Sequence, residues 1–238
     1  MEVTINKSNL KRFLNLISLT GENQIREALF TIKKDTITSF IKSPAGTVGL
    51  SATLKGKFQE VGEIGIDDLV LFENALNIQD KEETILKITE NKISISSGKT
   101  RASLLLRKPD YIKNKPKEED FKKYITSASG NEFVLTNEDI DKVMKAYNLI
   151  KSEVVTVSSE TGKSVKFLFS RLDNEIETEI DLQAEIKPFK TTVNSFLLYL
   201  LNLLEIVTIS IKKDTQIILL TYKEDKIEAT YIVAPYGK

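Results

Sequence analysis

The sequence predicts an α+β protein built from two copies of one unit of roughly 105 to 115 residues. Each copy begins with a short strand and an amphipathic helix, has a second helix near its middle, and ends in a two-stranded hairpin. The spacing of the copies is nearly constant, because Leu10 and Ile140 are 130 positions apart and Arg101 and Glu228 are 127 apart. A duplicated unit favours a symmetric assembly, and we expect a ring.

The first helix of each copy is predicted from the helical spacing of its apolar residues. In the first copy, from about Lys7 to Ser18, the residues at i, i+3, i+4 and i+7 are apolar, and the second copy repeats this stripe. The two stripes are Leu10, Phe13, Leu14 and Ile17, and Ile140, Val143, Met144 and Tyr147. Thr136 and Asp139 predict a capping pair at the start of the second-copy helix. The opposite, polar faces keep a basic residue at one shared position, Arg12 and Lys142.

The segments between the helices predict strands, because they alternate or cluster β-branched residues between turn signals. They are Ala28–Ile32, Thr36–Ile41 and Val48–Leu54 in the first copy, and Val154–Val157, Val165–Phe169 and Ile176–Leu182 in the second. The last of these alternates strictly, so we expect one buried face and one acidic face.

The second helices are predicted over Ile66–Asn77 and Val193–Leu204. The latter is apolar nearly all round and is expected in a deep core. Lys108–Gly130 fits neither copy, lacks a periodic apolar pattern and is predicted to be an exposed connector loop. We therefore expect an N-terminal domain at 1–110, a connector at 111–131 and a C-terminal domain at 132–238.

Composition excludes several classes of function. The chain has no cysteine and no histidine, which excludes disulfides, catalytic triads that need histidine, and zinc sites of the usual ligands. No apolar run reaches the roughly 18 residues of a membrane span, and the N-terminus lacks a secretion signal, so we expect no membrane and a cytoplasmic location. The 34 basic and 34 acidic residues cancel, so the chain either does not bind nucleic acid or binds it weakly, by one local face.

Two other functions stay open. Pro109-Asp110 followed by Asp120-Phe121-Lys122 resembles the metal-binding pattern of some nucleases, so a metal-dependent nuclease using Asp110, Asp120 and Lys122 is one alternative. It would need carboxylates clustered on strands, whereas these residues lie in the predicted connector. The other alternative is a two-domain scaffold that binds proteins without encircling DNA.

Three segments resemble the sliding DNA clamps of the proliferating cell nuclear antigen family and its T-even-phage-like relatives. They are Ile64-Gly65-Ile66-Asp67-Asp68-Leu69, Gly98-Lys99-Thr100-Arg101-Ala102-Ser103-Leu104 and Tyr231-Ile232-Val233-Ala234-Pro235. The resemblance covers nearly the whole chain and lies mainly in its architecture. It implies two tandem DNA-clamp domains per chain, with helices lining a central hole and antiparallel sheets outside, which close as a homotrimeric ring.

The resemblance also implies a function. Such a ring is a processivity factor that encircles double-stranded DNA of any sequence, tethers the replicative DNA polymerase and is opened by an ATP-dependent clamp loader. It is not an enzyme, and we expect no catalytic residue, cofactor or metal. The expected DNA-binding residues are Lys7, Lys11, Arg12, Lys142 and Lys145. The richness in Lys, Asn and Ile favours a phage or another AT-rich virus, and therefore the host cytoplasm.

Two contact surfaces follow from the same resemblance. Subunits would join by pairing Thr100–Arg107 with Ile176–Leu182 of a neighbour, and the opposite charges on these strands favour the same contact. The charged residues are Arg101, Arg107, Glu177, Glu179 and Asp181. A short partner peptide would enter a pocket between the connector and the C-terminal tail. The matching pocket positions are Val48, Leu50, Phe121, Tyr124, Ile125, Ile232, Ala234 and Pro235. An ordinary core role is the alternative for Val48, Leu50 and Ile232.

Overall fold

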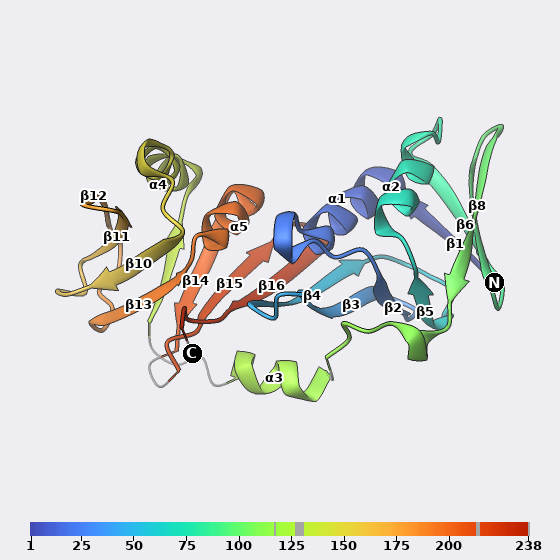
Figure 1. Cartoon of the computed structure of the whole chain (residues 1–238). Coiled ribbons are helices and arrows are strands. Elements are labelled where there is room, and N and C mark those ends of the chain that lie inside the picture. Colours follow the sequence, from blue (N-terminus) through green and yellow to red (C-terminus); the bar gives the residue numbers. More distant parts are fainter. Residues whose placement is uncertain (117, 127–130, 213–214, 238) are drawn as a thin grey trace. The chain divides into compact units, whose positions relative to one another are not determined.

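The computed structural model describes residues 1–116, 118–126, 131–212 and 215–237. The chain divides into two compact units, and each contains strands and helices (Figure 1). The first unit is Met1–Phe121 with Lys223–Ala229, and the second is Lys122–Tyr222 with Thr230–Lys238. The predicted α+β class is therefore confirmed. No helix in the described ranges is long and apolar enough to cross a membrane.

The first unit is an antiparallel sheet with two helices on one face (Figure 1). In spatial order its strands are β1 (Glu2–Asn6), β6 (Glu83–Ile88), β7 (Lys92–Ser97), β8 (Thr100–Arg107), β5 (Gly62–Ile66), β2 (Ala28–Ile32), β3 (Thr36–Lys42) and β4 (Val48–Lys55). The helices are α1 (Lys7–Ser18) and α2 (Leu69–Asn77), with short 3-10 turns η1 (Gly21–Asn23) and η2 (Pro109–Tyr111).

Three aromatic rings join the helices of the first unit to its sheet. Phe30 of β2 meets Phe13 of α1 edge-on at 5.5 Å between ring centroids, and it meets Phe72 of α2 in the same manner at 6.3 Å. Each of the three side chains is at most 2% exposed. Because burying a phenylalanine is among the largest single apolar contributions to folding, these contacts fix both helices on the same face.

The second unit has two groups of strands. One group is β12 (Asn174–Asp181), β11 (Ser164–Arg171), β10 (Val154–Ser159) and β13 (Phe189–Asn194), and the other is β16 (Ile227–Val233), β15 (Ile218–Lys223), β14 (Val207–Ile211) and β9 (Glu132–Leu135). Lys223 of β15 and the first three residues of β16 belong to the first unit. The helices are α4 (Asn137–Ile150) and α5 (Phe196–Leu204). Helix α4 packs on β11 and β12, where Tyr147 lies 5.9 Å from Phe169 between ring centroids.

The first helices of both copies form as the sequence predicts. Helix α1 spans Lys7–Ser18, and the side chain of Asn6 accepts a hydrogen bond from the backbone of Asn9 at its N-terminus. Helix α4 begins with the predicted pair as a full capping box, in which Thr136 and Asp139 bond reciprocally. Both starts depend on local hydrogen bonds, which explains why the sequence indicates them.

Both second helices begin later than predicted. Helix α2 starts at Leu69 because Gly62–Ile66 forms β5, and the side chain of Asp68 caps the helix. Helix α5 starts at Phe196, because β13 continues through Asn194 and pairs Val193 with Val155. In both cases an apolar residue at or next to the end of the strand, Ile66 or Val193, lies three positions before the first residue of an apolar helix, so hydrophobicity alone does not mark the boundary.

The prediction of a structureless connector is wrong for Glu118–Thr126, which forms helix α3. Glu118, Glu119 and Asp120 occupy its first turn and Lys123 its last, an order that favours a helix through its dipole. The only apolar residues, Phe121, Tyr124 and Ile125, have the spacing i, i+3, i+4. This short stripe is the signal that could have revealed the helix.

Candidate functional site

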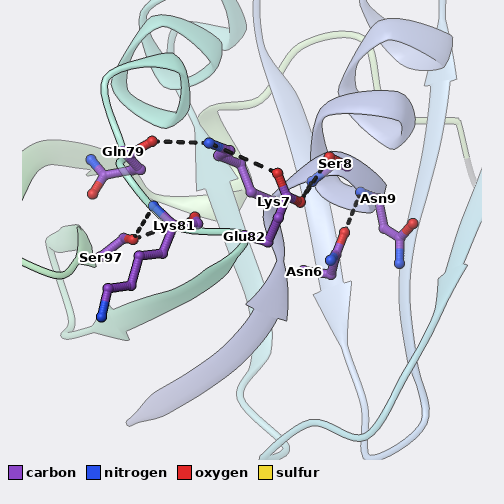
Figure 2. A network of polar contacts seen from close by, with 8 residues as sticks. All are labelled: Asn6, Lys7, Ser8, Asn9, Gln79, Lys81, Glu82 and Ser97. Carbon is purple, nitrogen blue, oxygen red and sulfur yellow. Dashed lines mark hydrogen bonds and ion pairs between the residues drawn. The ribbon is translucent and has the colours of Figure 1, made fainter.

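Lys7 is held by a polar network at the start of α1 (Figure 2). Its ammonium donates a hydrogen bond to the backbone oxygen of Gln79 at 2.9 Å and lies 4.0 Å from Glu82 Oε1. Glu82 also accepts hydrogen bonds from the hydroxyl of Ser8 at 2.8 Å and from its backbone nitrogen at 3.2 Å, and these lower the pKa of Glu82. Because the Lys7 side chain is only 18% exposed, it offers little charge to a ligand.

The exposed face of α1 carries Lys11 and Arg12, both half-buried. Arg12 Nε lies 3.8 Å from Glu224 Oε2, and its side chain is 25% exposed. The neighbouring Phe13 and Leu14 are buried in the core, which fixes the outward direction of the two basic residues. The carboxylate of Glu224 thus offsets part of the positive charge of Arg12. The side chains of Lys11 and Arg12 both still reach the surface.

Helix α4 presents Lys142 and Lys145 in the corresponding part of the second copy. Both are exposed, whereas Val143 between them is buried in the core. Lys142 Nζ lies 3.3 Å from Glu138 Oε1, one turn earlier on the same helix. An exposed i, i+4 pair is weak, on the order of 0.3–0.5 kcal/mol, so phosphate can replace it. On each helix the basic side chains are thus accessible, and nearby carboxylates offset part of their charge.

The expected pocket positions divide into two groups. Val48, Leu50, Phe121 and Ile232 are buried, with exposed fractions of 1%, 0%, 3% and 9%, so the structure places them in the core. Phe121 anchors α3 on β3 of the first unit, where it meets Phe40 edge-on at 5.8 Å between ring centroids. The ordinary core role that was the alternative for three of these positions thus agrees with their burial.

The other group stays accessible in the second unit. Tyr124 is 43% and Ile125 36% exposed, and Ala234 and Pro235 are half-buried. Beneath Tyr124, the buried Lys212 donates to the backbone oxygen of Lys123 at 3.3 Å, with its ammonium 5.5 Å from the centre of the tyrosine ring. These contacts hold one face of Tyr124 and leave the rest of the side chain accessible.

The two strands expected at the subunit contact both have an open edge. Strand β8 pairs with β7 along Thr100–Leu105, whereas on its other side the described ladder to β5 involves only Leu106 and Arg107. Strand β12 is the outer strand of its four-stranded group and, among the described residues, pairs with β11 alone. Open edges of this length are places where another chain can add a strand.

Several charged residues of these strands already have partners inside the chain. The guanidinium of Arg107 bonds the carboxylate of Glu27, and its Nη1 lies 3.1 Å from Asp67 Oδ1. Lys166 Nζ lies 3.1 Å from Glu177 Oε1, and the hydroxyl of Ser164 donates to Glu179. Arg101 and Asp181 are exposed on their strands.

The residues of the nuclease alternative do not lie on strands. Asp110 lies in η2, 3.8 Å from Lys115 Nζ, and Asp120 and Lys122 lie on α3. Within the described ranges, no group of three or more acidic residues is close enough to hold a metal ion. The structure therefore offers this alternative no support.

Known structures resemble the chain along its full length. It is similar to PCNA from Thermococcus kodakaraensis, with 19% identity, a TM-score of 0.75, and coverage of 98% of this chain and 99% of that one. It is also similar to A. fulgidus PCNA bound to the C-terminal region of FEN-1, with 15% identity, a TM-score of 0.79, and coverage of 100% and 98%.

A putative DNA polymerase III beta subunit from Eubacterium rectale is similar as well, with 13% identity and a TM-score of 0.78. All of this chain matches, but it spans only 65% of that subunit. No protein-family model matches the sequence, and no curated protein matches it at a significant level. The likeness shows the fold: the chain has the sliding-clamp fold of PCNA and the beta subunits, as the sequence predicts.

Proposed function

We propose that the chain is a DNA polymerase sliding clamp, a processivity factor that closes as a homotrimeric ring around double-stranded DNA. The observation that carries the proposal is the match to PCNA over 98% of this chain and 99% of that one. Residues 1–110 and 132–238 would be the two clamp domains, joined by 111–131. Six domains would then surround the hole.

The charge distribution supports this function. A clamp has to retain DNA by topology while it slides, so its lining needs long-range attraction without tight contacts. Lys11, Arg12, Lys142 and Lys145 provide such a surface on α1 and α4, two of them weakened by carboxylate neighbours. Lys7, which is bonded within the chain, has the smallest part in it.

Partner proteins would bind the accessible residues of the second unit, Tyr124, Ile125, Ala234 and Pro235. A short peptide gains most of its affinity from one or two buried apolar anchors, and these four residues offer accessible apolar surface. The replicative DNA polymerase is the expected partner, and an ATP-dependent loader would open the ring. The protein itself would have no catalytic activity, and a phage-encoded clamp would act in the host cytoplasm.

The absence of cysteine allows a direct test of DNA encirclement. Ser103→Cys on β8 and Glu177→Cys on β12 place one thiol on each proposed edge. Subunits dissociated by dilution are mixed with nicked circular plasmid, concentrated to form rings, and closed with a bismaleimide crosslinker. Gel filtration in high salt then separates retained from free protein.

A sliding clamp is expected to stay with the circular plasmid in high salt and to leave it after one restriction cut. Each single-cysteine variant, which cannot close the ring, is the matched control and is expected to elute free. Equal retention on circular and linear DNA would mean ordinary binding. Absence of retention despite efficient crosslinking into trimers would exclude encirclement.

A further inference from the structure

Glu27, the residue before β2, binds two segments that lie 80 and 86 positions further along the chain. Its Oε2 accepts a hydrogen bond from the guanidinium of Arg107, at the end of β8. Its Oε1 accepts a hydrogen bond from the backbone nitrogen of Lys113, in the connector, at 2.9 Å. The Glu27 side chain is only 13% exposed. One carboxylate within the first unit therefore holds both the end of β8 and the start of the connector.

The connector is also packed against the first unit on both sides of Lys113. Ile112 is 3% exposed, and the backbone oxygen of Asn114 accepts a hydrogen bond from the backbone nitrogen of Lys42 at 2.9 Å. The connector leaves the end of β8 and leads to α3 (Figure 1). The first part of this path is therefore fixed before α3 begins.

Gly65 of β5 allows the connector to lie close to the sheet. Gly65 pairs with Arg107, and a Cβ atom at this position would overlap the carbonyl oxygen of Arg107 and lie 3.2 Å from Ile112 Cδ1. A glycine inside a strand often marks such a close approach of two backbone segments. The close approach brings the start of the connector within reach of Glu27.

The two contacts of Glu27 differ in what can replace them. Arg107 Nη1 lies 3.1 Å from Asp67 Oδ1, so the guanidinium keeps an acidic neighbour when Glu27 is removed. The backbone nitrogen of Lys113 loses its bond to the carboxylate in that case. A charge-assisted bond also fixes the orientation of the groups that it joins. Arg107 therefore orients the carboxylate, and the carboxylate positions the connector.

The position of the connector matters for the proposed partner site. Helix α3 carries the accessible Tyr124 and Ile125, and Phe121 attaches the helix to Phe40 of β3. A connector that is loose in the free chain has to be ordered when a peptide binds, and that ordering lowers the affinity. A contact that fixes the connector beforehand therefore strengthens binding without touching the peptide.

We propose that Glu27 is a positioning residue of the partner-peptide site, which it serves by holding the connector at Lys113. The inference rests on the proposed function and adds a residue that lies outside the expected pocket positions. It also gives Arg107 a task within its own chain, because its guanidinium orients the Glu27 carboxylate.

The test measures peptide affinity by calorimetry on full-length variants. The probe is the tightest binder among short overlapping peptides that cover the DNA polymerase encoded by the same genome. Glu27→Ala is expected to weaken binding about fivefold or more, because the connector is no longer held in advance. Glu27→Gln keeps a carbonyl oxygen that accepts from Lys113, so its affinity is expected to stay within about twofold of wild type.

A change at Lys113 removes the same bond from the other side. Lys113→Pro lacks the N–H donor, and the preceding Ile112, with φ −72° and ψ 116°, has a conformation that suits a residue before proline. Lys113→Ala keeps the donor and is the matched control. Proline is expected to weaken binding as much as Glu27→Ala, whereas alanine is expected to have no effect. The variant with both Glu27→Ala and Lys113→Pro is expected to bind no more weakly than either alone, because each removes one shared bond.

Hydrogen exchange separates a positioning role from a general role in folding. The backbone amides of residues 108–116 are expected to exchange faster in Glu27→Ala than in wild type, while those of β2 and β3 keep their rates. Glu27→Gln is expected to restore the slow exchange. Faster exchange throughout the first unit would overturn the proposal, since Glu27 would then act on the fold as a whole.

The affinities distinguish this inference from the function on which it rests. If Tyr124→Asp abolishes peptide binding and Glu27→Ala binds like wild type, the positioning role is wrong and the clamp proposal stands. The role is equally wrong if Glu27→Gln binds as weakly as Glu27→Ala, because the bond to Lys113 would then be unimportant. A wild-type chain that binds none of the polymerase peptides overturns the partner site and this inference together, and retention on circular DNA then decides the clamp proposal separately.

Discussion

Lys166 Nζ of β11 lies 3.1 Å from Glu177 Oε1 of β12, the outer strand of the group. The hydrogen bond from Lys166 to Glu177, with the negative charges of Glu177 and Glu179, raises the pKa of the lysine. The acidic face of β12 is thus partly neutralised by its own sheet before any neighbour arrives. A subunit contact built on that face therefore has less net charge available than the sequence of β12 indicates.

Replacing Glu177 and Glu179 with lysine is expected to weaken the trimer severalfold. The new lysines would approach Arg101 of the neighbouring strand, and they would also lie beside Lys166. The measurement is the trimer dissociation constant at low and high salt, where the difference from wild type is expected to shrink as salt rises.

Glu177→Gln with Glu179→Gln is the matched control, since it removes the charge without reversing it. This control is expected to change the dissociation constant less than the lysine variant does. An unchanged trimer in the lysine variant would mean that β12 is not at the contact.

Alanine at Lys11, Arg12, Lys142 and Lys145 is expected to leave fold and trimer intact, because none of the four side chains is buried in the core. DNA retention or polymerase processivity is expected to fall, with a weaker dependence on salt because up to four phosphate contacts per subunit are lost. The measurement is retention on nicked circular DNA across a salt series.

Four exposed lysines away from α1 and α4 provide the control for net charge. Alanine at Lys33, Lys34, Lys57 and Lys87 removes the same charge and is expected to affect retention less. If both sets of alanines have equal effects, then the helix faces do not contact DNA specifically.

Phe121 and Tyr124, three residues apart on α3, are expected to behave oppositely. Phe121→Ala opens a cavity against Phe40 and is expected to cost about 3 kcal/mol, measured by urea unfolding. Tyr124→Asp alters an accessible side chain and is expected to cost little stability while abolishing binding of the polymerase peptide, measured by calorimetry.

Deleting Pro235–Lys238 is expected to act like Tyr124→Asp. The deletion removes the bridge of Pro235 to Val193 and the 2.7 Å hydrogen bond from the Tyr236 backbone to Thr192, both near the chain end. A truncated clamp that still stimulates its polymerase fully would place the docking site elsewhere.

The sequence indicates structure best where the determining contacts are local. The cap and stripe of α1 and the capping box of α4 involve residues at most four positions apart, and both helices form where expected. The start of α5 was misplaced because Val193 is apolar in a strand and in a helix alike. The pairing of Val193 with Val155, 38 positions away, determines its state.

The candidate site shows the same limit. Charge and spacing identify Arg12 and Lys142 as outward-facing basic residues, and the structure agrees. The sequence does not reveal that Lys7 is bound to Gln79, or that Arg107 is bound to Glu27, since these partners are 72 and 80 positions away.

Glu82→Gln is expected to lower stability at neutral pH, because the charged carboxylate is the form that the Ser8 hydroxyl and backbone favour. Since the folded pKa of Glu82 is lowered, its stabilising contribution is full above the ordinary glutamate pKa of about 4.3 and is lost as pH falls through the lowered value. Unfolding midpoints measured from pH 7 to pH 3 are expected to converge for wild type and variant at the acid end. A constant difference would show that the charge of Glu82 is unimportant.

The mass of the native assembly tests the central claim most directly. Native mass spectrometry or multi-angle light scattering on the full chain at high micromolar concentration is expected to give about 81 kDa, three chains of 26.9 kDa. On dilution the trimer is expected to dissociate at the β8 and β12 edges, so the measured average mass is expected to fall. A single species of one chain at that concentration would contradict the clamp, because one chain supplies only two of the six domains that the ring needs.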